Sequence, residues 1–269
     1  MAIIITPIPG KSSDTRAIKS MAEPIRWQLA TVIEIRQETP TVKSLILDAP
    51  HWTKYLAGQR VDVRLTAEDG YQAQRSYSIA SPPEDRFLML TVERIGDGEV
   101  SPYLTEELRV GDQLELRGPI GGYFVWDAND EKNQGVPLFL VAGGSGIVPL
   151  MAMIRHRTNS AKKVPVRLLY SSRTYENIIY RKELDNLAAG DSSLQITHTL
   201  TRQQPPNWNG FRRRIDLAML AETAWQSSES PLAFVCGPTA LVETVASYLE
   251  ELGYKSERIK TERFGPTGA

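Results

Sequence analysis

The sequence has 269 residues, enough for one large domain or two of ordinary size. Its formal net charge of −1 gives no electrostatic reason to bind nucleic acid or an anionic membrane. One cysteine, Cys236, and three scattered histidines exclude from this sequence an internal disulfide, a Cys-rich zinc site and a cysteine-ligated iron–sulfur cluster. Neither a signal-peptide pattern nor a bilayer-spanning apolar run is present, so we expect a cytoplasmic protein. Because its cysteine and histidines lack metal-ligand spacing, we expect that it binds no metal.

The first part of the chain predicts a β-barrel. Residues 1–24 mix Pro, Ser, Gly and charges without periodicity, and we expect a loose N-terminal arm there. Over residues 25–130, short stretches rich in Val, Ile, Leu and Thr alternate with polar or Gly/Pro segments. Such spacing is typical of an antiparallel barrel or sandwich. The predicted strands are 29–35, 41–47, 60–65, 75–80, 87–93 and 113–117. One helix is predicted over 101–108, with Ser101 as its cap and Pro102 at its first position.

The second part has a different pattern, and we place the boundary at residue 130, inside a polar, turn-forming stretch. Over residues 131–269, apolar stretches alternate with segments of helical periodicity. The predicted strands are 138–142, 166–170, 195–200, 232–236 and 258–261. The predicted helices start near Ile147 and span 181–188, 216–222 and 239–252. This alternation predicts an α/β domain with a doubly wound parallel sheet.

The first motif that carries chemistry is Arg75-Ser76-Tyr77-Ser78, on a predicted strand. A flavin dinucleotide needs a cation for its phosphates, a flat aromatic ring to pack on, and a hydroxyl near its reactive nitrogen. Arg75, Tyr77 and Ser78 supply these three kinds of group. An edge strand with a surface Arg and a half-buried Tyr is the structural alternative.

Three glycine-containing segments follow. The stretch 98–104, with Val100 and Ser101, opens a predicted helix whose free N–H groups suit a pyrophosphate; an ordinary capped helix is the alternative. The stretch 117–124 has two adjacent glycines and a proline, which indicate a tight turn. Gly143-Gly144-Ser145-Gly146-Ile147-Val148-Pro149 follows a buried strand and opens a helix, where glycines let dinucleotide phosphates approach the backbone.

The last of these motifs is Cys236-Gly237-Pro238, at the end of a predicted parallel strand. Ligands of open parallel sheets bind outside the carboxyl ends of the strands. A thiol at the start of a helix is expected to have a lowered pKa. A small buried apolar residue is the alternative interpretation of Cys236.

Together and in this order, the motifs resemble those of the ferredoxin–NADP reductase superfamily. The resemblance extends from about Trp27 to Phe264. It implies a flavoprotein enzyme in which NADPH gives hydride to FAD, and FAD gives electrons to a ferredoxin, a flavodoxin or another oxidoreductase subunit. Many reductases of this superfamily carry a fused iron–sulfur domain, which the single cysteine excludes from this sequence.

The resemblance also implies roles for individual residues. Arg75 and Ser101 would hold the FAD pyrophosphate, with Val100 beside them, and Tyr77 would pack on the flavin ring with Ser78 near its hydride-accepting nitrogen. The other implied cofactor-binding residues are Thr91, Val92 and Glu93 for the flavin and Gly143, Gly144, Ser145, Gly146, Pro149, Gly237 and Pro238 for the nicotinamide nucleotide. Cys236 would face the nicotinamide ring.

Glu262-Arg263-Phe264 resembles the acidic-x-aromatic ending of the superfamily. The resemblance implies that Phe264 covers the flavin until nicotinamide displaces it, with Glu262 close to the same place. Ser78, Cys236 and Glu262 are therefore the candidate catalytic residues. In many relatives the aromatic residue is the last one, whereas residues 265–269 follow it here.

The residues after the second and third parallel strands favour NADPH over NADH. A NAD site usually has an acidic residue after the second strand, but here Ser172 and Arg173 stand there. Thr201 and Arg202 follow the third strand, where relatives use a hydroxyl–arginine pair for the 2′-phosphate, and arginine suits a phosphate. Solvated loop arginines are the alternative, with NADH as the second candidate donor.

Two other functions remain open. The chain could be an electron-transfer subunit that is active only in a complex. It could also be a non-catalytic, flavin-binding redox sensor, although such a module would not need Ser78, Cys236 and Glu262 together.

Overall fold

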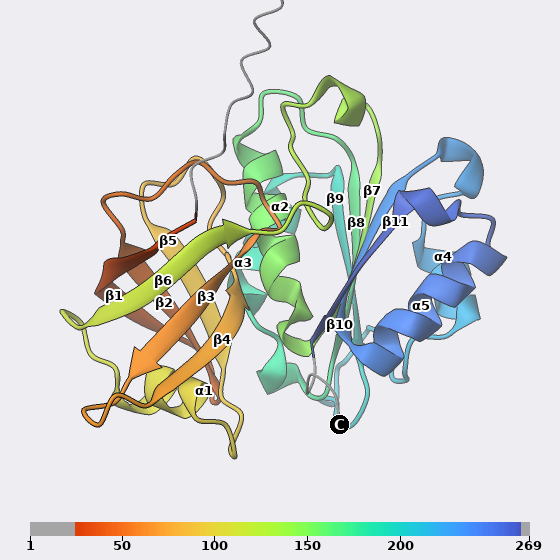
Figure 1. Cartoon of the computed structure of the whole chain (residues 1–269). Helices are drawn as coiled ribbons and strands as arrows, with labels where there is room; N and C mark the ends of the chain where they lie inside the picture. The colour runs from red at the N-terminus through yellow and green to blue at the C-terminus, as the bar shows by residue number, and fades with distance from the viewer. Residues whose placement is uncertain (1–24, 265–269) are drawn as a thin grey trace, which may run out of the picture.

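The computed structural model describes residues 25–264. They form a β unit and an α/β unit, which lie side by side (Figure 1). The predicted N-terminal arm over 1–24 and the tail over 265–269 lie outside the described residues. Among the helices of residues 25–264, none combines the length and the apolar character that crossing a membrane requires.

The first unit is a six-stranded antiparallel sheet in the order β4-β3-β6-β1-β2-β5. Its strands are β1 (Trp27–Thr39), β2 (Val42–Asp48), β3 (Arg60–Thr66), β4 (Gln72–Ser78), β5 (Leu88–Glu93) and β6 (Gln113–Ile120). An antiparallel bridge between Ile79 and Leu90 joins the two outer strands, which curls the sheet into a barrel. Buried Val, Leu and Ile side chains fill its interior. The predicted antiparallel barrel is therefore confirmed.

One detail of the barrel differs from the prediction. The helical segment starts with α1 (Val100–Pro102) and continues as a π-helical turn over Tyr103–Glu107. Glu99, not Ser101, occupies the position before the first turn. The Ser101 hydroxyl oxygen instead accepts the Ile95 N–H at 3.0 Å, so it closes the preceding loop, and the predicted Ser101 cap is wrong.

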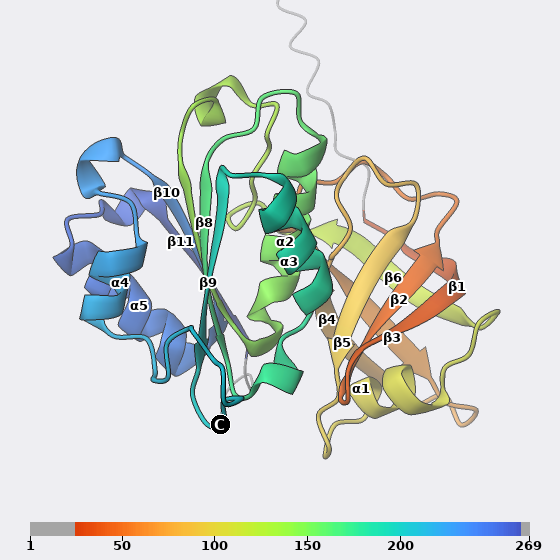
Figure 2. The ribbon, with the colours of Figure 1, turned by 180° about the vertical axis from the view of Figure 1, so that it is seen from behind.

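The second unit is a five-stranded parallel sheet in the order β11-β10-β7-β8-β9, so the predicted parallel sheet is also confirmed. Its strands are β7 (Leu138–Gly143), β8 (Val166–Ser172), β9 (Leu194–Leu200), β10 (Leu232–Pro238) and β11 (Ile259–Phe264). Its helices are α2 (Ile147–Asn159), α3 (Arg181–Gly190), α4 (Leu217–Thr223) and α5 (Thr239–Glu251). Seen from both sides, α2 and α3 cover the sheet face toward the barrel, and α4 and α5 cover the other face (Figures 1 and 2).

The central strand β7 explains this layering. All six of its residues are buried, because helices cover both faces of the sheet. Leu138 and Leu140 belong to the apolar core on the α2 side, whereas Phe139 and Val141 belong to the core on the α5 side. Burying each of these side chains contributes roughly 1.5–3 kcal/mol. The carboxyl end of β7 is thereby fixed where the two units meet.

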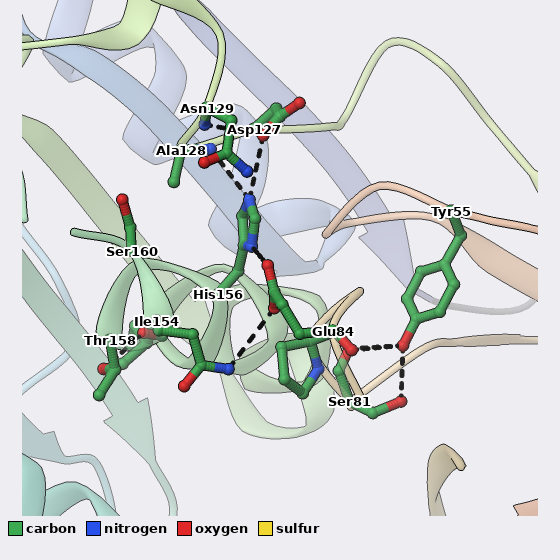
Figure 3. A network of polar contacts seen from close by, with 12 residues as sticks. Tyr55, Ser81, Glu84, Asp127, Ala128, Asn129, Ile154, His156, Thr158 and Ser160 are labelled. Atoms are coloured by element: carbon green, nitrogen blue, oxygen red, sulfur yellow. Dashed lines mark hydrogen bonds and ion pairs between the residues drawn. The ribbon is translucent and has the colours of Figure 1, made fainter. Parts of the chain in front are cut away.

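A buried histidine joins the two units (Figure 3). His156 of α2 is 3% exposed, and its Nδ1 lies 2.5 Å from Oε1 of Glu84, a barrel residue. Its Nε2 accepts the Ala128 N–H at 3.0 Å, so the ring proton lies on Nδ1 and is donated to Glu84. Asp127, next to Ala128, has a carboxylate oxygen 3.2 Å from the same Nε2. The ring thus ties α2 to the barrel and to the segment between the sheets.

Replacing His156 by alanine is expected to lower the free energy of unfolding by about 2–3 kcal/mol, because Glu84 and the Ala128 N–H lose their buried partner. Denaturant unfolding of His156→Ala measures this. His51→Ala, at an exposed histidine, is the matched control and should change stability by less than about 0.5 kcal/mol. Equal stability of the two variants would show that the His156 contacts do not hold the units together.

Candidate functional site

Glycines let the ends of β7 and β10 approach each other closely. A Cβ on Gly146 would lie 2.2 Å from the carbonyl oxygen of Cys236, and a Cβ on Gly237 would lie 3.1 Å from the Cα of Gly143. The 3-10 turn over Gly144–Gly146 therefore passes directly beside the end of β10 and leads into α2. Gly146 and Gly237 serve helix–strand packing here.

Gly144 has a different environment. Its φ of +55° lies in the left-handed region that favours glycine, and an added Cβ would meet nothing within 4 Å. Its carbonyl accepts the hydroxyl of Tyr170 at 3.1 Å, which fixes the turn from β8. Ser145 is half-buried, and Pro149 is buried in the first turn of α2. The turn thus presents open backbone at the N-terminus of a 13-residue helix, where an anionic group is favoured.

The four residues predicted to select the nucleotide come together at the ends of β8 and β9. Thr201 donates its N–H to the Ser172 carbonyl at 3.0 Å, and Arg202 donates its N–H to the Arg173 carbonyl at 2.9 Å. The side chains of Arg173 and Arg202 are exposed. In the part of the chain that the structure describes, neither guanidinium forms an ion pair, whereas Arg213 pairs with Asp216 at 2.5 Å. Two unpaired cations at adjacent strand ends suit a phosphate.

The Arg75–Ser78 motif lies at the end of β4, as predicted. Tyr77 is half-buried against the barrel core, and burial raises the pKa of its hydroxyl. Among the described residues, Arg75 makes one side-chain hydrogen bond, to the Gln74 carbonyl at 2.7 Å. Ser78 is 5% exposed, and within residues 25–264 its Oγ has no hydrogen-bond partner. A buried hydroxyl without a hydrogen-bond partner lowers the stability of the fold unless a ligand supplies that partner.

The predicted residues next to this motif have other structural contacts. The Oγ of Ser44 lies 2.8 Å from that of Thr91, which also receives the hydroxyl of Tyr180 at the start of α3. Val92 and Val100 are part of the barrel core. Glu93 is exposed at the end of β5. The side chains of Thr91, Val92 and Val100 therefore hold the fold, and any contact they make to a flavin would be through the backbone.

Cys236 and Glu262 face each other on neighbouring parallel strands, in register. The Cys236 Sγ lies 4.0 Å from Oε2 of Glu262. Burial, and then the charge of Glu262, raise the pKa of the thiol well above its ordinary value. The expected lowering of this pKa is wrong, because the completely buried sulfur loses more from desolvation than a helix start returns. Burial also raises the pKa of Glu262 to about 7.

Phe264 ends β11 opposite Pro238, half-buried against the core on the α2 side.

One residue that the sequence analysis missed lies near Glu262. Arg60 begins β3, pairs in register with Ser78, and places its Nη1 4.0 Å from Oε1 of Glu262. No pattern in the sequence distinguishes Arg60 from an ordinary strand residue, because the contact joins positions far apart in the chain.

These residues fit a flavin dinucleotide between the two units. Ser78 offers a buried hydroxyl without a partner, Tyr77 an aromatic ring, and Arg75 an exposed guanidinium. On the other side lie the Gly144 turn and the pair Cys236–Glu262. The arrangement is typical of a protein with one flavin-binding unit and one nicotinamide nucleotide-binding unit.

Comparison with known proteins gives the same division. Residues 29–125 match the family described as Oxidoreductase FAD-binding domain, and residues 140–247 match Oxidoreductase NAD-binding domain. The chain is 32% identical over 252 residues to Ferredoxin--NADP reductase B of Sorangium cellulosum, covering 90% of this chain and 98% of that protein. It therefore belongs to the ferredoxin–NADP reductase superfamily, as the sequence motifs predicted.

Two further similarities add detail. The chain is 32% identical over 242 residues to the glycine betaine monooxygenase reductase subunit of Chromohalobacter salexigens, covering 88% of this chain but 64% of that protein. A solved FAD/NAD-binding domain of nitric oxide dioxygenase from Vibrio cholerae has a TM-score of 0.77 and 25% identity, covering 89% of this chain and 99% of that one.

Proposed function

We propose that this chain is a reductase that oxidises NADPH and passes the electrons to an acceptor protein through FAD. The observation that supports this proposal is a series of contacts that runs from the barrel to the parallel sheet. Ser78 is in register with Arg60, Arg60 reaches Glu262, and Glu262 faces Cys236. A bound FAD supplies the group that takes up hydride and releases electrons.

The residues of the chain then have separate tasks. The hydroxyl of Ser78 would donate a hydrogen bond to the flavin, and Arg75 would hold its phosphate charge. Cys236 would border the nicotinamide ring once the nucleotide is bound, and because burial raises the pKa of its thiol, the sulfur would be uncharged there. Glu262 borders the same space and changes its charge near pH 7. Together these groups bring donor and acceptor into a fixed orientation.

The proposed acceptor is a ferredoxin, a flavodoxin or an oxygenase component. Similar proteins include the reductase subunit of glycine betaine monooxygenase and the ferredoxin reductase component of the naphthalene dioxygenase system. The names of these proteins also support a second candidate, a subunit that is active only in a complex. We keep residue 130 as the proposed boundary between the FAD and NAD(P) domains. The cytoplasm is the proposed compartment, on the cysteine content of the sequence.

To test the proposed function, the purified protein is assayed for bound FAD and for NADPH-driven reduction of ferricyanide and of a ferredoxin. We expect stoichiometric FAD and reduction of both acceptors. Reduction that requires an added partner protein would favour the subunit. A protein that binds FAD but reduces neither acceptor, with or without partners, would overturn the enzymatic function.

The choice of nucleotide gives a further prediction. Arg202→Ala is expected to raise the KM for NADPH about tenfold or more and to leave the KM for NADH within about twofold, because it removes a charge contact worth about 1.5–3 kcal/mol from the 2′-phosphate alone. Steady-state kinetics with both nucleotides measures this. Arg214→Ala, an exposed arginine 12 residues further along, is the control. An equal effect of Arg202→Ala on both nucleotides would contradict the assignment.

A further inference from the structure

Arg60 links the barrel to the parallel sheet beside the proposed reaction centre. It begins β3, and its guanidinium passes over Gly121, where an added Cβ would lie 3.4 Å from Nη1. From there Nη1 lies 4.0 Å from Oε1 of Glu262 in β11. The Arg60 side chain is 41% exposed and that of Glu262 is 16% exposed. The arginine is therefore partly solvated, whereas the carboxyl group is largely shielded from solvent.

The same arginine is adjacent to Ser78. The two residues are direct partners in the antiparallel pairing of β3 with β4, so their side chains project from the same face of the sheet. Arg60 therefore lies next to Ser78 in the barrel and contacts Glu262 in the parallel sheet. The contact between Arg60 and Glu262 exists only when the two domains are docked. It therefore links the charge of the Glu262 carboxyl group to the docked arrangement.

Glu262 is poorly solvated and has few neighbours that could set its charge. Burial raises its pKa to about 7, and the charge of Arg60 acts in the opposite direction. Among residues 25–264, the charged or titratable groups that face this carboxyl are Arg60 from β3 and Cys236 from β10. The thiol is uncharged at neutral pH because burial raises its pKa. Arg60 is thus the cation that counteracts the effect of desolvation on the pKa of Glu262.

We propose that Arg60 is a positioning residue of the hydride-transfer site, which holds the Glu262 carboxylate beside Cys236 from across the domain boundary. Arginine suits this task because its guanidinium remains charged at all relevant pH values and reaches over the Gly121 turn. The role of Arg60 as a positioning residue rests on the proposed function. The electrostatic contact itself can be measured without turnover.

The test is a pH titration of the Glu262 carboxyl in the FAD-loaded protein, by NMR of ¹³C-carboxyl-labelled glutamate. The resonance is assigned by its disappearance in Glu262→Gln. In the wild type we expect a midpoint near 7. In Arg60→Met the midpoint should rise by about one pH unit, because the nearby cation is lost and the protonated form is favoured. Arg60→Lys should restore most of the difference.

A matched control is available on the same strand. Arg64 pairs with Glu115 at 2.6 Å on the barrel surface, so Arg64→Met removes a comparable ion pair away from the site and should leave the Glu262 midpoint unchanged. An unchanged midpoint in folded Arg60→Met, or a shift of equal size in Arg64→Met, would overturn the proposal. If Arg60→Met fails to fold, Arg60→Gln takes its place with the same expected shift.

The titration separates the two proposals. A shifted midpoint in a protein that NADPH cannot reduce would overturn the proposed function and keep the electrostatic contact. Normal reduction of the flavin with no shift would overturn the role of Arg60 alone. The pH profile of the reduction rate gives a second readout: its inflection near 7 should move up with the midpoint in Arg60→Met.

Discussion

Ser78→Ala is expected to slow reduction of the bound flavin by NADPH about 10²- to 10³-fold, because it removes a hydrogen-bond donor from the reacting centre. The same substitution should leave the stability of the flavin-free protein unchanged or slightly higher. The reason is that Ser78 Oγ is buried, and within residues 25–264 it has no partner, so alanine removes an uncompensated polar group. Stopped-flow absorbance and denaturant unfolding measure the two effects.

Ser76 provides the matched control. It lies two residues earlier on the same face of β4, but it is exposed and its hydroxyl donates to Asp62 at 2.6 Å. Ser76→Ala should keep the reduction rate within about threefold, because the Ser76 hydroxyl is bonded to Asp62 and is not available to a flavin. A Ser78→Ala variant that reduces its flavin at the wild-type rate would show that this hydroxyl does not take part in the reaction.

Gly146→Ala is expected to destabilise the protein by about 3 kcal/mol or more and to reduce hydride transfer as well. The added Cβ would lie 2.2 Å from the carbonyl oxygen of Cys236. The φ of Gly146 is −60°, which alanine adopts without strain, so the cost is steric. Relief requires the first turn of α2 or the end of β10 to move, and β10 carries Cys236. A displacement of about 1 Å at a reaction centre can cost 100-fold in rate.

Gly122→Ala serves as the comparison, since an added Cβ there meets nothing within 4 Å. It should change stability by less than about 1 kcal/mol. Thermal or denaturant unfolding of both variants, with the rate of flavin reduction, tests the prediction. If Gly146→Ala were as stable and as fast as Gly122→Ala, the close packing of the α2 turn on β10 would not be required.

The overall architecture was predictable because both periodicities are clear in the sequence. Continuous apolar runs such as 138–142 became buried parallel strands, and the alternating stretches of the first part became the barrel. The start of the helical segment was predicted incorrectly. Serine and proline at 101 and 102 form the usual pattern of a cap, yet the Ser101 hydroxyl is occupied by the Ile95 N–H. A loop contact of this kind competes with capping and leaves no local signal.

The site was predictable where a motif holds its residues together and less so where packing decides. Cys236 and Glu262 face each other across neighbouring strands, whereas Ser78 pairs with Arg60 on the barrel, and the roles that the superfamily resemblance implies for the three residues stay predictions. The pKa of Cys236 was predicted in the wrong direction, because complete burial is a property of the folded sheet and cannot be read from a helix start. Arg60 was missed because its contact to Glu262 depends on how two domains dock.

The most direct test of the central claim is an anaerobic titration of the purified FAD-bound protein with NADPH and, separately, with NADH, followed by the visible absorbance of the flavin. We expect complete bleaching by both nucleotides, with NADPH effective at a concentration at least about tenfold lower, because in the proposed site Arg173 and Arg202 would bind the 2′-phosphate. A yellow protein that neither nucleotide bleaches, or a protein that does not take up FAD, would contradict the account.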